Sequence, residues 1–285
     1  MHGIDLTIPR GSFFGLLGPN GAGKSTLINI LAGTVLKTSG TVNVCGHDLD
    51  SATRAAKMSL GIVPQELVLD TFFTVRQALE ITAGYYGIPK DKRRTDEIID
   101  AMGLRDKADQ PSRRLSGGMR RRLLIGKALV HTPPVLILDE PTAGVDVELR
   151  RSLWEYVRKL NAQGTTILLT THYLEEAEEL CDEIAIIHKG AIIKRDRKDS
   201  LMRGVDSKEV TFTLETPLET LPAGFDDLQA SLRGGELVVK YQPSKAHMNE
   251  ILLRLQGAGL TIRDISTDEV ELEDLFLALT SDKAA

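Results

Sequence analysis

The sequence predicts an α/β domain with a mostly parallel core sheet, followed by a small α+β domain, and three observations lead to this prediction. Short apolar runs, typical of strands buried on both faces, occur at residues 13–17, 60–63, 135–138 and 166–169. Segments with helical spacing separate these runs, and strands that alternate with helices form parallel sheets. Beyond about residue 204 the pattern changes. We therefore expect one domain over residues 1–204 and a second over 205–285.

Further strands complete the first domain. Residues 4–8 alternate apolar and polar side chains, which predicts a short half-buried strand. Residues 41–45, which Gly46 follows, predict another strand. Residues 184–187 and 191–193 flank a Lys-Gly turn, so we expect a hairpin and hence an antiparallel part of the sheet.

Residues 71–133 read as a helical insert in this domain. Thr74 and Gln77 form a capping box that opens a helix. A second helix is expected over residues 94–102. A third is expected after residues 115–119 and through Val130, ended by a Pro-Pro pair at 133–134.

The second domain is expected to have its own core. Residues 210–214 and 237–241 predict strands, and the spacing of apolar residues over 248–255 and 272–279 predicts two amphipathic helices. This region contains no pattern of residues that suggests catalysis.

Residues 18–26 form the motif around which the chain is organised. They lie between an apolar run and an amphipathic run, the strand–loop–helix order of a phosphate-binding loop. The loop consists of Gly18, Pro19, Asn20, Gly21, Ala22, Gly23, Lys24, Ser25 and Thr26. Its glycines let backbone N–H groups point at an anion, and the helix that begins near Lys24 adds the positive end of its dipole. We expect Lys24 to reach the β- and γ-phosphates of a nucleoside triphosphate and the Ser25 hydroxyl to bind Mg²⁺.

Two carboxylates at a strand end predict the other half of a nucleotide site. Asp139 and Glu140 directly follow the run 135–138. An aspartate in this position can hold Mg²⁺, directly or through water. Glu140 projects differently and can act as the general base for an attacking water.

Residues 115–118, Leu-Ser-Gly-Gly, are the most specific signal in the chain. The hydroxyl of Ser116 and the bare backbone of Gly117 and Gly118, at a helix N-terminus, predict a second anion site. One nucleotide has a single γ-phosphate, so a second anion site is usually explained by a nucleotide sandwiched between the two.

At this point the chain resembles the ATPase subunit of an ABC transporter, over residues 4–200 and closest to the ABC-2 exporter branch. The similar motifs, in family order, are Walker A (18–26), the Q-loop (Gln65), the signature (115–119), Walker B (135–140), the D-loop (144–146) and the switch histidine (His172). The resemblance implies the P-loop NTPase fold of ABC ATPases.

The resemblance also implies a head-to-tail homodimer that sandwiches two ATP molecules. Ser116, Gly117 and Gly118 of one chain would contact the γ-phosphate bound to the other chain. In this scheme Glu140 activates water, and His172 holds the γ-phosphate and the water.

The remaining implied roles concern the metal and the partners. Mg²⁺ would be bound by Ser25, Gln65 and Asp139, and Gln65 would link it to the helical insert. Asp146 would act across the dimer interface. The insert would dock on a membrane permease, which places the chain on the cytoplasmic face of the membrane and couples ATP hydrolysis to export.

The sequence departs from the family pattern in two places. Met119 stands where the signature commonly has Gln, and we expect little loss because Ser116 and the glycines carry the phosphate contacts. Family members also have a strand and an aromatic residue upstream, on which adenine stacks. The sequence begins inside the region that should follow them, so we assign no residue to that stacking and expect poor discrimination between ATP and GTP.

Composition and charge favour no other class. The net charge of −5 gives no reason to expect nucleic acid as a partner. Arg120, Arg121 and Arg122 point in different directions on a helix, and we interpret them as solvated and interfacial charge. Cys45 and Cys181 form no metal or disulfide pattern, which suggests a reducing compartment. No apolar run reaches the ~20 residues of a membrane span, and no signal peptide is evident.

Two alternatives remain within the same family. A soluble ABC ATPase of chromosome or translation machinery would need a long coiled-coil insert or a second cassette, and neither is present in the sequence. A degenerate, non-catalytic cassette would have lost some of the residues Lys24, Asp139, Glu140 and His172, which are intact.

Overall fold

The computed structural model describes residues 1–142, 147–204, 208–222, 224–225, 228–242, 245–268 and 272–280. The chain divides into two compact units, Met1–Lys198 and Asp199–Ala285. The division comes at the start of helix α8 (Lys198–Gly204), whereas the sequence suggested one at its end. No helix in the described ranges is long and apolar enough to cross a bilayer.

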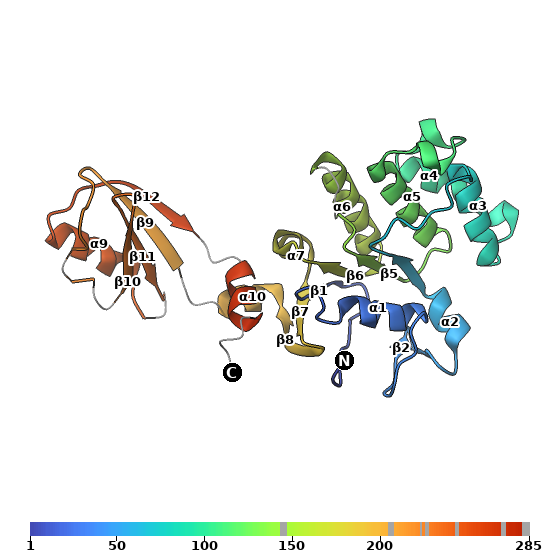
Figure 1. The fold of residues 1–285 in the computed structure, drawn as a ribbon, viewed down its shortest axis with the longest axis horizontal. Helices are drawn as coiled ribbons and strands as arrows, with labels where there is room; N and C mark the ends of the chain where they lie inside the picture. The colour runs from blue at the N-terminus through green and yellow to red at the C-terminus, as the bar shows by residue number, and fades with distance from the viewer. Residues whose placement is uncertain are drawn as a thin grey trace. The chain divides into compact units, whose positions relative to one another are not determined.

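A six-stranded sheet forms the centre of the first unit (Figure 1). Its strands are β1 (Phe13–Leu17), β4 (Leu60–Val63), β5 (Val135–Asp139), β6 (Thr166–Thr171), β7 (Glu183–His188) and β8 (Ala191–Arg197). Their order is β4-β5-β6-β1-β7-β8, and every neighbouring pair is parallel except β7 and β8. The predicted mostly parallel sheet, with an antiparallel hairpin, is confirmed.

Helices cover both faces of this sheet. Figure 1 shows α1 on one side and α6 on the other. The helices of this part are α1 (Lys24–Ala32), α2 (Thr53–Met58), α6 (Val147–Ala162) and α7 (Leu174–Leu180). Strands β1 and β6 are buried along their whole length and β5 from Leu136 onward, as Phe14, Leu168 and Ile137 illustrate at 0–1% exposure. Because the sheet is covered on both faces, its strands read as continuous apolar runs rather than as alternating patterns.

The predicted helical insert forms a cluster of its own, at the upper right of Figure 1. It contains α3 (Val75–Tyr85), α4 (Thr95–Ala101), α5 (Gly117–Leu129) and the 3₁₀ turns Lys90–Lys92, Arg105–Lys107 and Ser112–Arg114. The capping box is confirmed: the hydroxyl of Thr74 accepts from Gln77 N, and the Gln77 side chain accepts from Thr74 N. Gly126 lets the helices approach, since a Cβ there would lie 3.0 Å from Ile98 Cγ2.

Two strand predictions in the first unit are wrong. Residues 4–8 form no strand, although Ile4, Leu6 and Ile8 pack, partly buried, against the core. The alternation correctly predicted one buried face, but this segment packs on the core without pairing with a strand. Of residues 41–45, only Asn43–Val44 form a strand (β2), which pairs with His47–Asp48 (β3).

The second unit is an antiparallel sheet with one helix packed on its apolar face. Its elements are β9 (Lys208–Leu214), β10 (Gln229–Arg233), β11 (Glu236–Tyr241), β12 (Ile262–Asp268), α9 (Met248–Gly257) and α10 (Leu272–Thr280), and the strand order is β10-β11-β9-β12. Phe212 and Val239 of the sheet meet Ile251 and Leu255 of α9 in a separate core. The sequence predicted β9, β11 and both helices but missed β10 and β12.

Candidate active site

The loop of residues 18–23 lies between the end of β1 and the start of α1. Gly21 and Gly23 have φ angles of 80° and 114°, in the left-handed region that favours glycine. Gly18 has no room for a side chain, because a Cβ there would lie 2.4 Å from the carbonyl oxygen of Ile187. Gly21 is exposed, so the curled backbone is open to a ligand.

Lys24 is the first residue of α1, and its side chain folds back onto the loop. Its Nζ donates to the carbonyl oxygens of Gly18 at 2.6 Å and Pro19 at 3.3 Å, and the residue is 5% exposed. Burial lowers the pKa of Lys24, while the carboxylates of Glu140 and Asp139 act in the opposite direction. A cation is therefore held inside the loop, within the field of two carboxylates.

The two residues that follow Lys24 differ from it in exposure. Ser25 and Thr26 lie in the first turn of α1, and both are exposed. Their hydroxyl groups are therefore accessible at the helix N-terminus, where an anion is favoured.

Asp139 and Glu140 lie at the end of β5, at 7% and 8% exposure. The hydroxyl of Thr170, on the neighbouring strand β6, donates to Asp139 Oδ1. Burial raises the pKa of Asp139, and the Thr170 hydrogen bond opposes this effect. Glu140 has a φ of 45°, a left-handed backbone that is uncommon for a residue with a side chain. This turn of the backbone separates the directions of the two carboxylates.

The side chains of Gln65 and His172 meet at the carboxylate of Glu140, and the three residues follow three adjacent strands. The Nε2 of Gln65, which follows β4, donates to Glu140 Oε2 at 2.9 Å. The Nδ1 of His172, which follows β6, lies 3.3 Å from the same oxygen. In the sheet β5 lies between β4 and β6 and is parallel to both, so the carboxyl ends of these strands bring the three residues to one edge of the sheet.

Ser116 is the N-cap of α5, and its Oγ accepts from Met119 N at 3.3 Å. Ser116 and Gly117 are exposed, and Gly118 is half-buried. Within the described residues, no hydrogen bond or ion pair joins Ser116 to the loop of residues 18–26. Within one chain, the two predicted anion sites are therefore not joined by a hydrogen bond or an ion pair.

The interpretation of the three arginines as solvated and interfacial charge is wrong in its solvated part for Arg121. Its side chain is 4% exposed, and it donates to the carbonyl oxygens of Pro64 at 2.7 Å and Gln65 at 2.8 Å. Arg122 donates to the carbonyl oxygen of Met102 at 2.9 Å. The sequence does not indicate which of these arginines is buried, because the strand end that Arg121 contacts is distant in the chain.

A buried carboxylate, which sequence reasoning also missed, lies behind the site. Glu176 of α7 is 3% exposed and accepts from the hydroxyl groups of Thr142 and Thr171, the latter at 2.8 Å. Arg150 Nε lies 3.7 Å from it. Burial raises the pKa of Glu176, and the two hydroxyl groups oppose this effect. Glu176 therefore connects the segment after Glu140 to the end of β6. The proposed D-loop residue Asp146 lies outside the described residues.

Comparison with known proteins gives consistent matches. A family model described as "ABC transporter" matches residues 1–143. The chain is 44% identical to the "Nod factor export ATP-binding protein I" of Ralstonia nicotianae, over 98% of this chain and 88% of that protein. It is 36% identical to the "Linearmycin resistance ATP-binding protein LnrL" of Bacillus subtilis, over 98% and 93%.

Solved structures agree with the fold. An ATP-binding subunit of an ABC transporter matches with a TM-score of 0.65 and 29% identity, over 70% of this chain and 84% of that one. An ATP-binding cassette, described as dimeric and in a post-hydrolysis state with ADP and Pi, matches with a TM-score of 0.63 and 25% identity, over 68% and 89%.

Proposed function

Since the chain belongs to the ABC transporter family, as an exporter-type ATP-binding subunit that hydrolyses ATP, we propose that Glu140 is the general base of this hydrolysis. The observation that carries the proposal is the meeting of Gln65 and His172 on one oxygen of Glu140. A carboxylate held in this way can take a proton from a water without changing its own position. His172 then orients the water and the γ-phosphate.

The phosphates of ATP fit the loop of residues 18–26. Its exposed backbone supplies N–H donors, and Lys24 can exchange its bonds to Gly18 and Pro19 for bonds to phosphate oxygens. The positive end of α1 adds to the attraction. We assign ATP binding to Gly18, Pro19, Asn20, Gly21, Ala22, Gly23, Lys24, Ser25 and Thr26.

The oxygen groups beside the loop suit Mg²⁺. Across the described ranges, no group of three or more His, Cys, Asp or Glu side chains is arranged to hold a metal ion alone. Mg²⁺ commonly takes one or two protein ligands and completes its shell with phosphate oxygens and water. Ser25, Gln65 and Asp139 therefore suit an ion that arrives with the nucleotide. When bound, the ion neutralises charge on the phosphates.

A second copy of the chain completes the site. ABC ATPase cassettes dimerise, and the exposure of Ser116 and Gly117 is what a head-to-tail arrangement needs. In that arrangement Ser116, Gly117 and Gly118 contact the γ-phosphate bound by the partner chain, and Asp146 lies at the interface. No step in this scheme involves nucleic acid.

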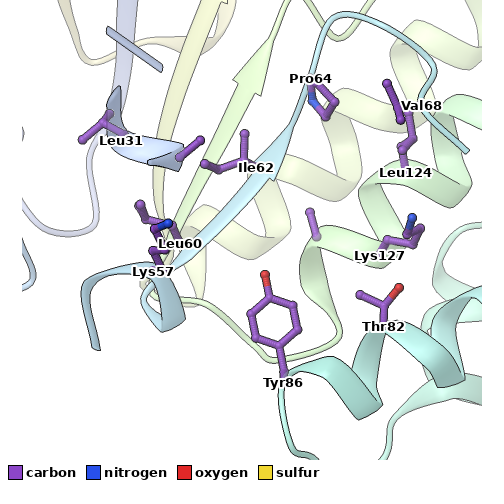
Figure 2. Close-up of a pocket in the computed structure, with 12 residues that line it drawn as sticks. Leu31, Lys57, Leu60, Ile62, Pro64, Val68, Thr82, Tyr86, Leu124 and Lys127 are labelled. Atoms are coloured by element: carbon purple, nitrogen blue, oxygen red, sulfur yellow. The ribbon is translucent and has the colours of Figure 1, made fainter. Parts of the chain in front are cut away.

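The helical insert offers a groove for a membrane partner. A cavity of about 350 Å³ lies between α1, β4 and the insert. Figure 2 shows side chains that line it, among them Tyr86 and Lys127. Val68 lines this cavity, and Val68, Leu67, Phe72 and Phe73, which are close in sequence, are apolar and 39–75% exposed. Exposed apolar clusters of this kind mark interaction sites. ABC ATPase cassettes work with membrane permeases, and we place a cytoplasmic permease segment in this groove.

The relatives indicate the direction of transport. They are named for Nod factor export and for linearmycin resistance. We propose that ATP hydrolysis by this chain powers export of a substrate through the permease, at the cytoplasmic face of the membrane. An ATPase without a transport role is the second candidate, and purification with or without a permease distinguishes the two.

The test is the substitution Glu140→Gln, which keeps the size of the side chain and removes the base. We expect turnover to fall by roughly 10²–10⁴-fold while ATP binding remains. Glu175→Gln, the same change at an exposed position near His172, is the control and should hydrolyse at the wild-type rate. A Glu140→Gln chain that hydrolyses at the wild-type rate contradicts the assignment.

A further inference from the structure

Arg121 connects two parts of the site that lie far apart in the sequence. It belongs to α5, the helix that begins directly after Ser116. Its two terminal nitrogens donate to adjacent carbonyl oxygens, those of Pro64 at 2.7 Å and Gln65 at 2.8 Å. A planar guanidinium that donates from both terminal nitrogens restrains the position of that turn relative to the helix more than a single hydrogen bond would.

The turn that Arg121 holds has little regular structure of its own. Residues 64–69 follow β4 without helix or strand, and Gln65 to Val68 are exposed. Arg121 is 4% exposed, and burial lowers its pKa while Asp139 acts in the opposite direction. The buried guanidinium is therefore a fixed point from which the exposed turn extends.

The side chain of Gln65 continues the connection to the carboxylate. While its carbonyl oxygen is held by Arg121, its Nε2 donates to Glu140 Oε2 at 2.9 Å. A displacement of α5 would thus move the Gln65 backbone and change this bond. The path runs from Ser116 through Arg121 and Gln65 to Glu140.

The neighbouring arginine gives the contrast. Arg122 donates from one nitrogen to the carbonyl oxygens of Met102 at 2.9 Å and Gly103 at 3.3 Å. These atoms follow α4, inside the helical insert, so Arg122 ties α5 to its own cluster. Arg121 alone of this pair ties α5 to the strand end that carries Gln65.

We propose that Arg121 is a positioning residue that couples the two ATP sites of the dimer. The proposal rests on the proposed roles of Ser116 and Glu140. Because Ser116 contacts the ATP bound by the partner chain, that contact sets the position of α5. Arg121 transmits this position to Gln65, and Gln65 sets the orientation of Glu140 in its own chain. ATP at one site thereby prepares the carboxylate of the other.

The first test compares ATP hydrolysis by Arg121→Ala, Arg121→Lys and the control Arg122→Ala. For Arg121→Ala we expect kcat to fall about 10-fold or more with KM changed less than about twofold, and the Hill coefficient for ATP to fall towards 1. The lysine of Arg121→Lys can still donate to one carbonyl, so its kcat should lie between those of the wild type and Arg121→Ala. Arg122→Ala should lose thermal stability to a similar degree but keep both kcat and the Hill coefficient.

A double-mutant cycle with Gln65→Ala tests the path itself. If Arg121 acts through Gln65, the double variant Arg121→Ala/Gln65→Ala should be no slower than Gln65→Ala. Effects that multiply would show that Arg121 acts elsewhere and would overturn the proposal. Equal losses of kcat in Arg121→Ala and Arg122→Ala would also overturn it, because they would indicate a purely structural role.

A measurement without turnover separates this proposal from the proposed function. Both chains carry Glu140→Gln, and one also carries Arg121→Ala. ATP should slow amide hydrogen exchange of residues 66–69 in the chain that keeps Arg121 and should leave it unchanged in the Arg121→Ala chain. Exchange that responds equally in both chains refutes the coupling by Arg121. Continued hydrolysis by Glu140→Gln would instead refute the assignment of the base.

Discussion

The Nδ1 of His172 lies 3.3 Å from Oε2 of Glu140, the same oxygen that accepts a hydrogen bond from Gln65. Two groups, from the ends of the strands on either side of β5, therefore lie against one oxygen of the carboxylate. Among the contacts of the described residues, none involves Oε1 of Glu140. That second oxygen is the one that can face a water, and the orientation of Glu140 depends on its two neighbours.

Removal of the imidazole should slow hydrolysis more than it weakens binding. For His172→Ala we expect kcat to fall by roughly 10²-fold, the usual effect of losing one preorganised polar contact to a transition state. Steady-state kinetics and ATP titration measure the two quantities. His47→Ala, an exposed histidine on β3, is the control and should behave as wild type. Equal losses in kcat and in ATP affinity would speak against the assigned role.

Sites shared between two chains should be recoverable by mixing. Lys24→Ala and Ser116→Arg chains should each be inactive alone, but half of the dimers in an equal mixture are mixed. Each mixed dimer has one site with an intact Lys24 and an intact Ser116, so at most about a quarter of the wild-type activity should return. The return should be about a tenth of that if Arg121 couples the sites, because the other site has lost both Lys24 and Ser116 and cannot prepare Glu140. Lys24→Ala mixed with the double variant has no intact site and is the control. A first mixture without activity contradicts the head-to-tail arrangement.

A charge in the proposed docking groove should separate transport from hydrolysis. Val68 is apolar, 65% exposed and lines the cavity of Figure 2. We expect Val68→Asp to lose most of its co-purification with the permease, because a carboxylate must be desolvated in an apolar contact. ATP hydrolysis by the free chain should persist. Leu36→Asp, at a 92% exposed apolar position outside the groove, should retain the permease. Equal retention by both variants would contradict the docking site.

The buried carboxylate of Glu176 should make stability depend on pH in a defined direction. Burial raises its pKa above the ordinary value of 4.5, so the folded chain holds this proton more tightly than the unfolded chain. The contribution of Glu176 to the free energy of unfolding is therefore greatest below about pH 4.5. It is lost as the pH rises through the raised pKa, by at most about 1.4 kcal/mol per pH unit.

Glu176→Gln removes this titration. The difference in unfolding free energy between wild type and Glu176→Gln, measured with urea at several pH values, should move against the wild type as the pH rises. Glu175 is exposed, so the same comparison with Glu175→Gln should show no such trend. A difference that moves in favour of the wild type with rising pH would show that ionised Glu176 stabilises the fold.

Much of the proposed site could be predicted because its chemistry follows strand ends. Gln65, Glu140 and His172 each come two or three residues after an apolar run. The carboxyl ends of parallel strands share one edge, so their proximity follows from the fold class. The order of the strands did not follow, because the sequence does not show that β1 inserts between β6 and β7.

The errors have physical causes. Alternation at residues 4–8 reports one buried face, and a packed extended segment satisfies that pattern as well as a strand does. Charge patterning places arginine in solvent, but Arg121 is buried because two carbonyl oxygens, 56 and 57 positions away, satisfy its guanidinium. Such contacts depend on tertiary structure, and local spacing does not contain them.

The backbone of Glu140 has a consequence for attempts to engineer this protein. A residue with a side chain at a φ of 45° costs on the order of 1 kcal/mol relative to glycine. Glycine or asparagine at this position would relax the backbone and remove the carboxylate together. A laboratory selection for heat resistance alone would therefore enrich inactive chains, and screening for thermostable variants has to score turnover in the same round.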